Sequence, residues 1–279
     1  MSSRTLAWTL LVAIAAAAVL LFNYWVSYQL LSMLAYSGIV LALGGLANLV
    51  FPFRLLGVRK RAMGALILVG GMALTFAALS WPASTIRVAQ PRTRFDEIMP
   101  EYQFFERHSA RVHARPEQVM PATRESTFGD LKSLGTLLRI RASIVRAPSQ
   151  GAEAFSQGKR ILDAFSVSGY VSGGNEHEIV VCGGANVRAQ RGLEVRTLQE
   201  FADYREQGAV KIAFGFNVED AGNGWSTVVA ETRVLAMDDL TRRGMARYWR
   251  LIVPGSGLLR RQWLDGIKKR AENLPNPAS

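Results

Sequence analysis

The chain has 279 residues, of which 49% are hydrophobic, with 33 Lys and Arg against 22 Asp and Glu. Eight basic residues and no acidic ones lie in residues 1–94, so the rest of the chain is nearly neutral and the high isoelectric point gives little support to nucleic-acid binding. The one cysteine, Cys182, excludes an intrachain disulfide and a multi-cysteine metal site, and we expect it to be buried and inert.

Three long apolar stretches without a charged residue fill most of the N-terminal third. We expect them to form helices at about 5–26, 28–51 and 63–83, because each supplies roughly the 20 residues that a bilayer core requires. They predict a three-helix transmembrane anchor over residues 1–84. The second and third stretches carry small residues that would allow close helix contact, namely Gly38, Ala42, Gly44, Gly45, Ala47, Gly64, Gly70 and Gly71.

The basic residues predict how the anchor is oriented. Four of them lie at 54–61, between the second and third helices, and Arg4 precedes the first. The positive-inside rule then puts the N-terminus in the cytoplasm and the domain after the third helix on the outer side. Three arginines at 87–94 count against this orientation. We therefore predict a multi-pass protein of the cell membrane with an extracytoplasmic domain.

The remainder predicts an α+β domain at 100–273, behind a linker at 85–99 and before a short tail at 274–279. The clearest strand is 209–219, where five apolar residues alternate with others in strict period two. The turn residues 220–224 join it to the next strand as a hairpin. The other expected elements are strands at 102–114, 169–175, 178–187 and 225–236, helices from 116 and 127, and a C-terminal helix at 238–272 interrupted at Pro254–Gly257.

Three segments carry a family resemblance. Residues 107–119 contain a strand running into the helix start Pro116-Glu117, residues 230–234 resemble a last strand, and residues 247–261 contain Tyr248-Trp249 followed by Pro-Gly-Ser-Gly. In this order the region 102–271 resembles the START-like, or SRPBCC, superfamily, which includes plant pathogenesis-related allergens, polyketide cyclases and lipid-transfer domains. The resemblance implies a helix-grip fold, in which a long C-terminal helix packs across a curved antiparallel sheet. The membrane anchor departs from the usual soluble pattern of this superfamily.

The resemblance also implies an apolar cavity between sheet and helix, and hence non-catalytic binding of a hydrophobic or amphipathic ligand such as a lipid. The aromatic residues that we expect to touch it are Tyr170, Phe214, Phe216, Tyr248 and Trp249; the alternative is that they simply fill the core. Glu231 and Arg233 lie two apart on one strand face, and they would form the polar floor of the cavity, pair with each other or lie on an exposed face.

Two other classes of function remain open: an enzyme of the cyclase or dehydratase kind, and an interaction module with a filled core. The sequence has no Ser–His–Asp order, phosphate loop or carboxylate pair that requires catalysis. We expect no catalytic residue, metal or cofactor, and we expect residues 176–178 to form a solvated loop rather than a metal site. The expected partners are the ligand and the bilayer, and the oligomeric state stays undetermined.

Overall fold

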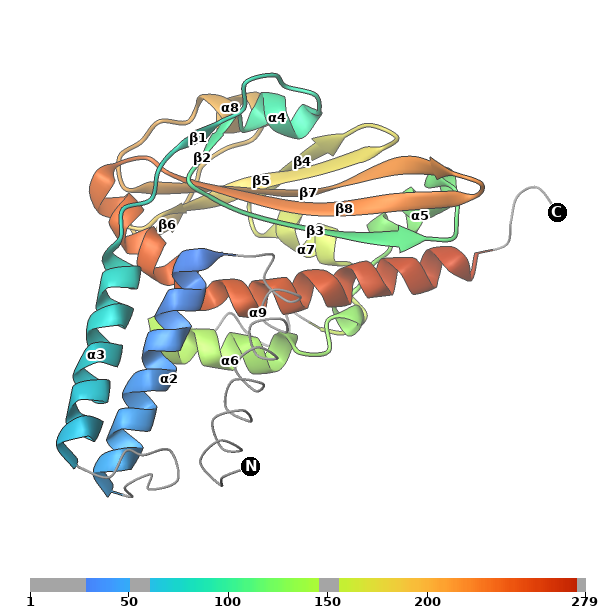
Figure 1. Cartoon of the computed structure of the whole chain (residues 1–279). Coiled ribbons are helices and arrows are strands. Elements are labelled where there is room, and N and C mark those ends of the chain that lie inside the picture. The colour runs from blue at the N-terminus through green and yellow to red at the C-terminus, as the bar shows by residue number, and fades with distance from the viewer. Residues whose placement is uncertain (1–28, 51–60, 146–155, 275–279) are drawn as a thin grey trace, which may run out of the picture. The chain divides into compact units, whose positions relative to one another are not determined.

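The computed structural model describes residues 29–50, 61–145 and 156–274, and its fold is α+β (Figure 1). By internal contacts the chain divides into two units. The first is Met1–Pro82 with Ala246–Pro254, and the second is Ala83–Met245 with Gly255–Ser279. The helix expected at 5–26 and nearly all of the tail lie outside the described residues.

Two helices of the first unit are long and apolar enough to cross a membrane, by length and composition. They are α2 (Leu30–Val50) and α3 (Arg61–Ser80), and they match the second and third predicted spans. Their contact depends on small residues. A Cβ at Gly71 would lie 2.4 Å from the backbone nitrogen of Ala42, whereas a Cβ at Gly70 would meet nothing within 4 Å. The predicted close contact is therefore confirmed for one glycine face of each helix.

The C-terminal helix α9 (Asp239–Glu272) contributes residues 246–254 to this first unit. The buried Arg250 donates to the carbonyl oxygens of Leu79 and Trp81, both at 2.8 Å, which satisfies acceptors at the C-terminal end of α3. The interruption predicted at Pro254 is wrong, because α9 continues through this proline. Proline removes one backbone hydrogen bond from the helix. Side-chain contacts before and after Pro254, made by Arg250 and Ser256, compensate for this loss.

The second unit is built on a six-stranded antiparallel sheet with the order β3-β8-β7-β5-β4, and β6 pairs with β5. Its strands are β3 (Phe104–Val112), β4 (Val171–Gly174), β5 (Glu178–Asn186), β6 (Arg191–Gly192), β7 (Ala209–Gly222) and β8 (Trp225–Ala236). The predicted hairpin is confirmed: Gly222 pairs with Trp225, and Gly222, Asn223 and Gly224 all have positive φ. A separate pair joins β1 (Ile86–Arg87) to β2 (Glu101–Tyr102).

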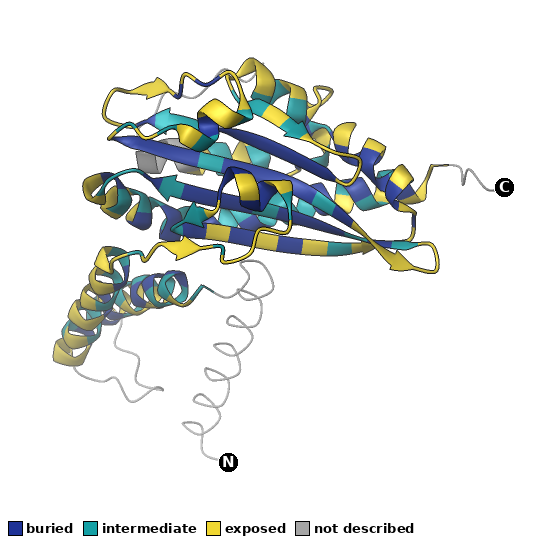
Figure 2. Ribbon diagram, turned by 90° about the horizontal axis from the view of Figure 1, so that it is seen from above, coloured by how far each residue is buried: buried dark blue, intermediate teal, exposed yellow. Residues whose placement is uncertain are grey.

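Helices cover both faces of the sheet, so that the central strands are buried along most of their length (Figures 1 and 2). One face carries α5 (Pro116–Arg124), the 3-10 turn η2 (Phe128–Asp130), α6 (Leu134–Val145), α7 (Ile161–Val167) and the second half of α9. The other face carries α4 (Arg94–Ile98) and α8 (Leu198–Asp203). We refer to these as the α9 face and the α4 face.

The stretch 85–99, predicted as a linker, is folded onto the α4 face. Thr93 caps α4 by accepting from the Asp96 N–H, and Phe95 and Ile98 are buried. The Glu178 carboxylate accepts the backbone N–H of Arg94 at 2.9 Å and that of Phe95 at 2.8 Å. The helix α4 is therefore part of the second unit's core, whereas residues 85–92 are mostly exposed.

Candidate functional site

The aromatic residues expected under the C-terminal helix fill the space that they were predicted to line. Phe214 and Phe216 are 2% and 1% exposed, and Phe216 lies edge-on to Trp263 of α9, with ring centroids 4.8 Å apart. Phe165 packs on Phe214 at 4.6 Å and on Tyr170 at 5.2 Å. Three of the predicted ligand residues are thus brought together, as members of one packed cluster on the α9 face.

A polar cluster occupies another part of the α9 face. Glu106 and His108 of β3 are 1% and 3% exposed, and a Glu106 oxygen lies 2.8 Å from His108 Nε2. Ser256 of α9 donates to the other Glu106 oxygen at 2.6 Å, and Arg260 donates to Thr232 at 2.7 Å. Sequence reasoning missed this cluster. The space between sheet and helix holds packed rings and buried hydrogen bonds here, where the resemblance implied an apolar cavity.

Glu231 and Arg233 form an ion pair, which was one of the predicted alternatives. The Arg233 Nε lies 2.7 Å from the Glu231 carboxylate. They lie on the α4 face, so they are not the floor of a cavity under α9. The Arg233 guanidinium also bonds the Asp96 carboxylate at 2.6 Å and the Met99 carbonyl at 3.0 Å, and it lies 4.8 Å from the ring centroid of Phe95. Arg233 therefore fastens α4 to the sheet.

Tyr248 and Trp249 belong to the first unit, whereas the other five predicted residues belong to the second. Trp249 is 5% exposed and its indole N–H donates to the side chain of Gln29 at 3.1 Å. Its role within its own unit is therefore packing and hydrogen bonding beside α2. The seven predicted residues thus fall into three places: the α9 face, the α4 face and the first unit.

A hollow of about 280 Å³ lies on the α4 face of the second unit. It is bounded by the segment from α4 to β2, the end of α8, β7, the end of β8 and the start of α9. Its apolar lining includes Ile98, Met99, Leu235 and Met237. This volume is just below the usual range of ligand pockets, so one short chain or one small ring system would fill it.

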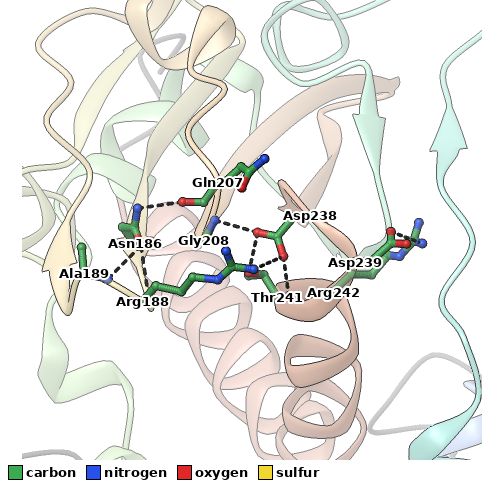
Figure 3. A network of polar contacts seen from close by, with 9 residues as sticks. All are labelled: Asn186, Arg188, Ala189, Gln207, Gly208, Asp238, Asp239, Thr241 and Arg242. Carbon is green, nitrogen blue, oxygen red and sulfur yellow. Dashed lines mark hydrogen bonds and ion pairs between the residues drawn. The ribbon is translucent and has the colours of Figure 1, made fainter.

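One wall of the hollow is the N-terminus of α9, which a polar network fixes in place (Figure 3). Asp238 caps α9 by accepting from the Thr241 N–H at 3.0 Å, and it also accepts the Gly208 N–H at 2.6 Å. Burial alone would raise the pKa of Asp238, but these backbone hydrogen bonds and the nearby Arg188 lower it to about 2. Asp238 is therefore an ionised, fully engaged structural group.

Lys211 of β7 is the buried cation of the hollow. Its side chain is on the α4 face, the residue is 2% exposed, and its ammonium lies 4.7 Å from the ring centroid of Phe201. It donates to the Ala202 carbonyl at 2.9 Å. Burial, and then the charge of Arg205, lower the pKa of Lys211 to about 8. Such a buried ammonium beside a hollow marks a candidate site.

Three carboxylates also line the hollow, and each is held by an arginine. The arginine partners are Arg87 for Glu101, Arg188 for Asp238 and Arg242 for Asp239, all at 2.7 Å. Within the described residues, the cations Lys211 and Arg205 form no ion pair with a carboxylate. Lys211 donates to the Ala202 carbonyl, and Arg205 donates to the carbonyls of Ala202 and Tyr204. The lining thus has three acidic and three basic residues, and among the described residues Lys211 and Arg205 are the two of these cations that make no ion pair.

Two other kinds of reactive site were considered from the sequence, a cysteine nucleophile and a metal site. Cys182 is buried as predicted, and burial raises the pKa of its thiol to about 12, which leaves it protonated. Among the residues that the structure describes, no three His, Cys, Asp or Glu side chains are placed to hold a metal ion.

Comparison with protein-family models, with curated proteins and with solved structures finds no match for this chain. Its function is therefore argued from its own residues.

Proposed function

We propose that this chain is a membrane-anchored, START-like domain that binds a hydrophobic or amphipathic ligand without catalysis. Support for the resemblance comes from the strand order, in which the first long strand pairs with the last, and from the long final helix on one sheet face. The ligand would occupy the hollow on the α4 face. The packing of Phe214 and Phe216 leaves them no role in lining a cavity, so we do not place it under α9.

The observation that carries this proposal is the apolar lining of the hollow. Ile98, Met99, Leu235 and Met237 come from separate segments of the chain and converge on one concavity. Covering such surface with a ligand removes it from water, at about 25 cal/mol per Å² of apolar area. The carboxylates of the hollow are held in ion pairs, which favours binding over proton-transfer chemistry.

We also propose that α2, α3 and the apolar stretch at 5–26 form the anchor, with the N-terminus in the cytoplasm and the second unit outside. The basic loop at 54–61 carries this orientation. Single cysteines placed in this loop and at Glu219 would be tested for labelling by a membrane-impermeant maleimide on intact cells, in a Cys182→Ala background. Labelling at 219 alone supports the orientation; labelling in the loop alone reverses it.

The binding proposal is tested by photolabelling the full chain in lipid nanodiscs with a diazirine-bearing ten-carbon alcohol. We expect crosslinks on peptides containing Met99 and Leu235. The variant Leu235→Trp, which fills the hollow, should abolish them. The matched control Phe105→Trp places a tryptophan at an exposed position of the edge strand β3 and should leave them unchanged. Labelling spread over the chain, and insensitive to Leu235→Trp, would refute ligand binding in the hollow.

A further inference from the structure

The hydrogen bonding of Lys211 is incomplete for a buried ammonium. An ammonium carries three N–H donors and no acceptor. Within the described part of the chain, Lys211 has one acceptor, the Ala202 carbonyl at 2.9 Å, and one aromatic face, that of Phe201. Buried polar groups are normally satisfied by hydrogen bonds. The remaining donors of Lys211 therefore have room for an acceptor supplied from the hollow that it lines.

The charges around Lys211 select the kind of acceptor. Burial and the charge of Arg205 lower the pKa of Lys211, the charge of Asp203 raises it, and the protonated Cys182 thiol is also near. The Asp203 carboxylate accepts a hydrogen bond from Gln199 at 2.7 Å. The other ionised groups of the hollow, Glu101, Asp238, Asp239 and Arg242, are all in ion pairs. Lys211 and Arg205 are thus two like charges facing one space. An anion placed between them would relieve their repulsion and supply acceptors to both.

We infer that the ligand of this hollow is an anionic amphiphile, whose carboxylate or phosphate is bound by Lys211 with Arg205 and whose short apolar part rests on Ile98, Met99 and Leu235. This rests on the proposed function and names the ligand class for the same site. Both parts of such a ligand would find partners here: Lys211 lies on β7 and Arg205 follows α8, Leu235 is the cross-strand neighbour of Lys211 on β8, and Ile98 and Met99 lie at the end of α4. The hollow is too small for a lipid with two long chains.

The test uses the full chain in nanodiscs. It measures how far unlabelled compounds reduce the photolabelling of the peptides that contain Met99 and Leu235. The competitors are decanoate, decyl phosphate and decanol, and each is compared between wild type and Lys211→Met, so that partitioning into the lipid cancels. Loss of a charge-assisted hydrogen bond should weaken competition by the two anions about 10- to 100-fold. Competition by decanol should be the same in both proteins. Lys132→Met, at an exposed lysine outside the hollow, is the matched control.

The outcomes separate this inference from the proposed function. If both anions and decanol compete equally well and Lys211→Met changes none of them, the hollow binds amphiphiles but the inference is overturned. If none of the three competes in wild type, the proposed function fails as well. If only one anion depends on Lys211, it identifies the headgroup as a carboxylate or a phosphate monoester.

A second measurement guards against a variant that misfolds. In wild type, competition by decanoate should weaken as the pH rises above the range in which Lys211 is protonated, with its pKa near 8 in the free site. Decanoate stays ionised throughout, so this change reports the protein. Decanol competition should stay flat with pH. A flat profile for decanoate as well would overturn the role of Lys211.

Discussion

Replacing Lys211 with methionine should stabilise the protein. The side chain is 2% exposed, so folding removes a charged ammonium from water, with one carbonyl and one ring as partners. Methionine has a similar length and belongs in the apolar surroundings that Phe201 and Ala213 provide. The free energy of unfolding should therefore rise when the charge is removed, which is the reverse of the usual result for a buried residue.

The magnitude follows from the shift in pKa. A fall from 10.5 to about 8 corresponds to roughly 3 kcal/mol of unfavourable free energy for the charged form at neutral pH. Part of the hollow is open to solvent, and the Ala202 carbonyl loses one of its two donors while Arg205 remains, so we expect a net gain of about 1–2 kcal/mol. For a chain of this size that is a rise in Tm of roughly 2–8 °C.

The assay is thermal unfolding of the full chain in nanodiscs, followed by tryptophan fluorescence. The pH dependence has a definite sign. Above about pH 8 the folded protein loses the Lys211 proton, whereas the unfolded chain keeps it until about pH 10.5. The wild type should therefore gain stability relative to Lys211→Met as the pH rises from 8 to 10.5, and the difference in Tm should shrink. A variant that is less stable at pH 7, or a pH-independent difference, would refute this reasoning.

Three further substitutions test the structure under the same assay. Gly71→Leu should separate α2 from α3 and lower stability by about 1–3 kcal/mol, whereas Gly70→Leu, which points away, should be tolerated; equal effects would contradict the helix pairing. Arg233→Met should cost about 3–5 kcal/mol, since it leaves the Asp96 carboxylate buried without its cation, and it should also reduce photolabelling of the hollow; unchanged stability would contradict its role as a fastener. Asp238→Ala should cost about 1–2 kcal/mol at neutral pH through loss of the α9 cap. Because the pKa of Asp238 is lowered to about 2, the wild-type advantage should vanish as the pH falls from about 4 to 2, and an advantage that persists at pH 2 would count against the cap.

The sheet could be predicted because its strands follow simple patterns. The alternation from Val210 to Val218 defines the α9 face of β7, and three successive residues with positive φ at 222–224 correspond to the Gly-Asn-Gly turn. The helix start at Pro116 could also be predicted from the sequence, since proline suits the first helical position. Each of these patterns involves residues that are close together in the chain, so each could be recognised without knowing the tertiary structure.

The site could not be predicted because it depends on which segments cover the second sheet face. In the alternation of β7, Lys211 stands among the residues between the five apolar ones, and the sequence does not show what covers that face. Lys211 is buried because α4 and α8 cover that side, and α4 comes from residues predicted as a linker. The small residues Ala213 and Gly215 on the same side of β7 were the available signal, since small side chains leave room for a covering layer. Pro254 is the converse case, where a strong local rule is overridden by contacts distant in sequence.

Two buried cations on the α4 face, Arg233 and Lys211, therefore have different explanations. Arg233 has carboxylates on two sides, a carbonyl acceptor and two aromatic faces, so its charge is offset by the fold and its removal should unfold α4. Lys211 has one carbonyl and one ring, and its removal should stabilise the fold. Folding accounts for the first charge but not for the second. A charge that folding does not require, placed beside a hollow with apolar lining, is the feature that the proposed anionic ligand would explain.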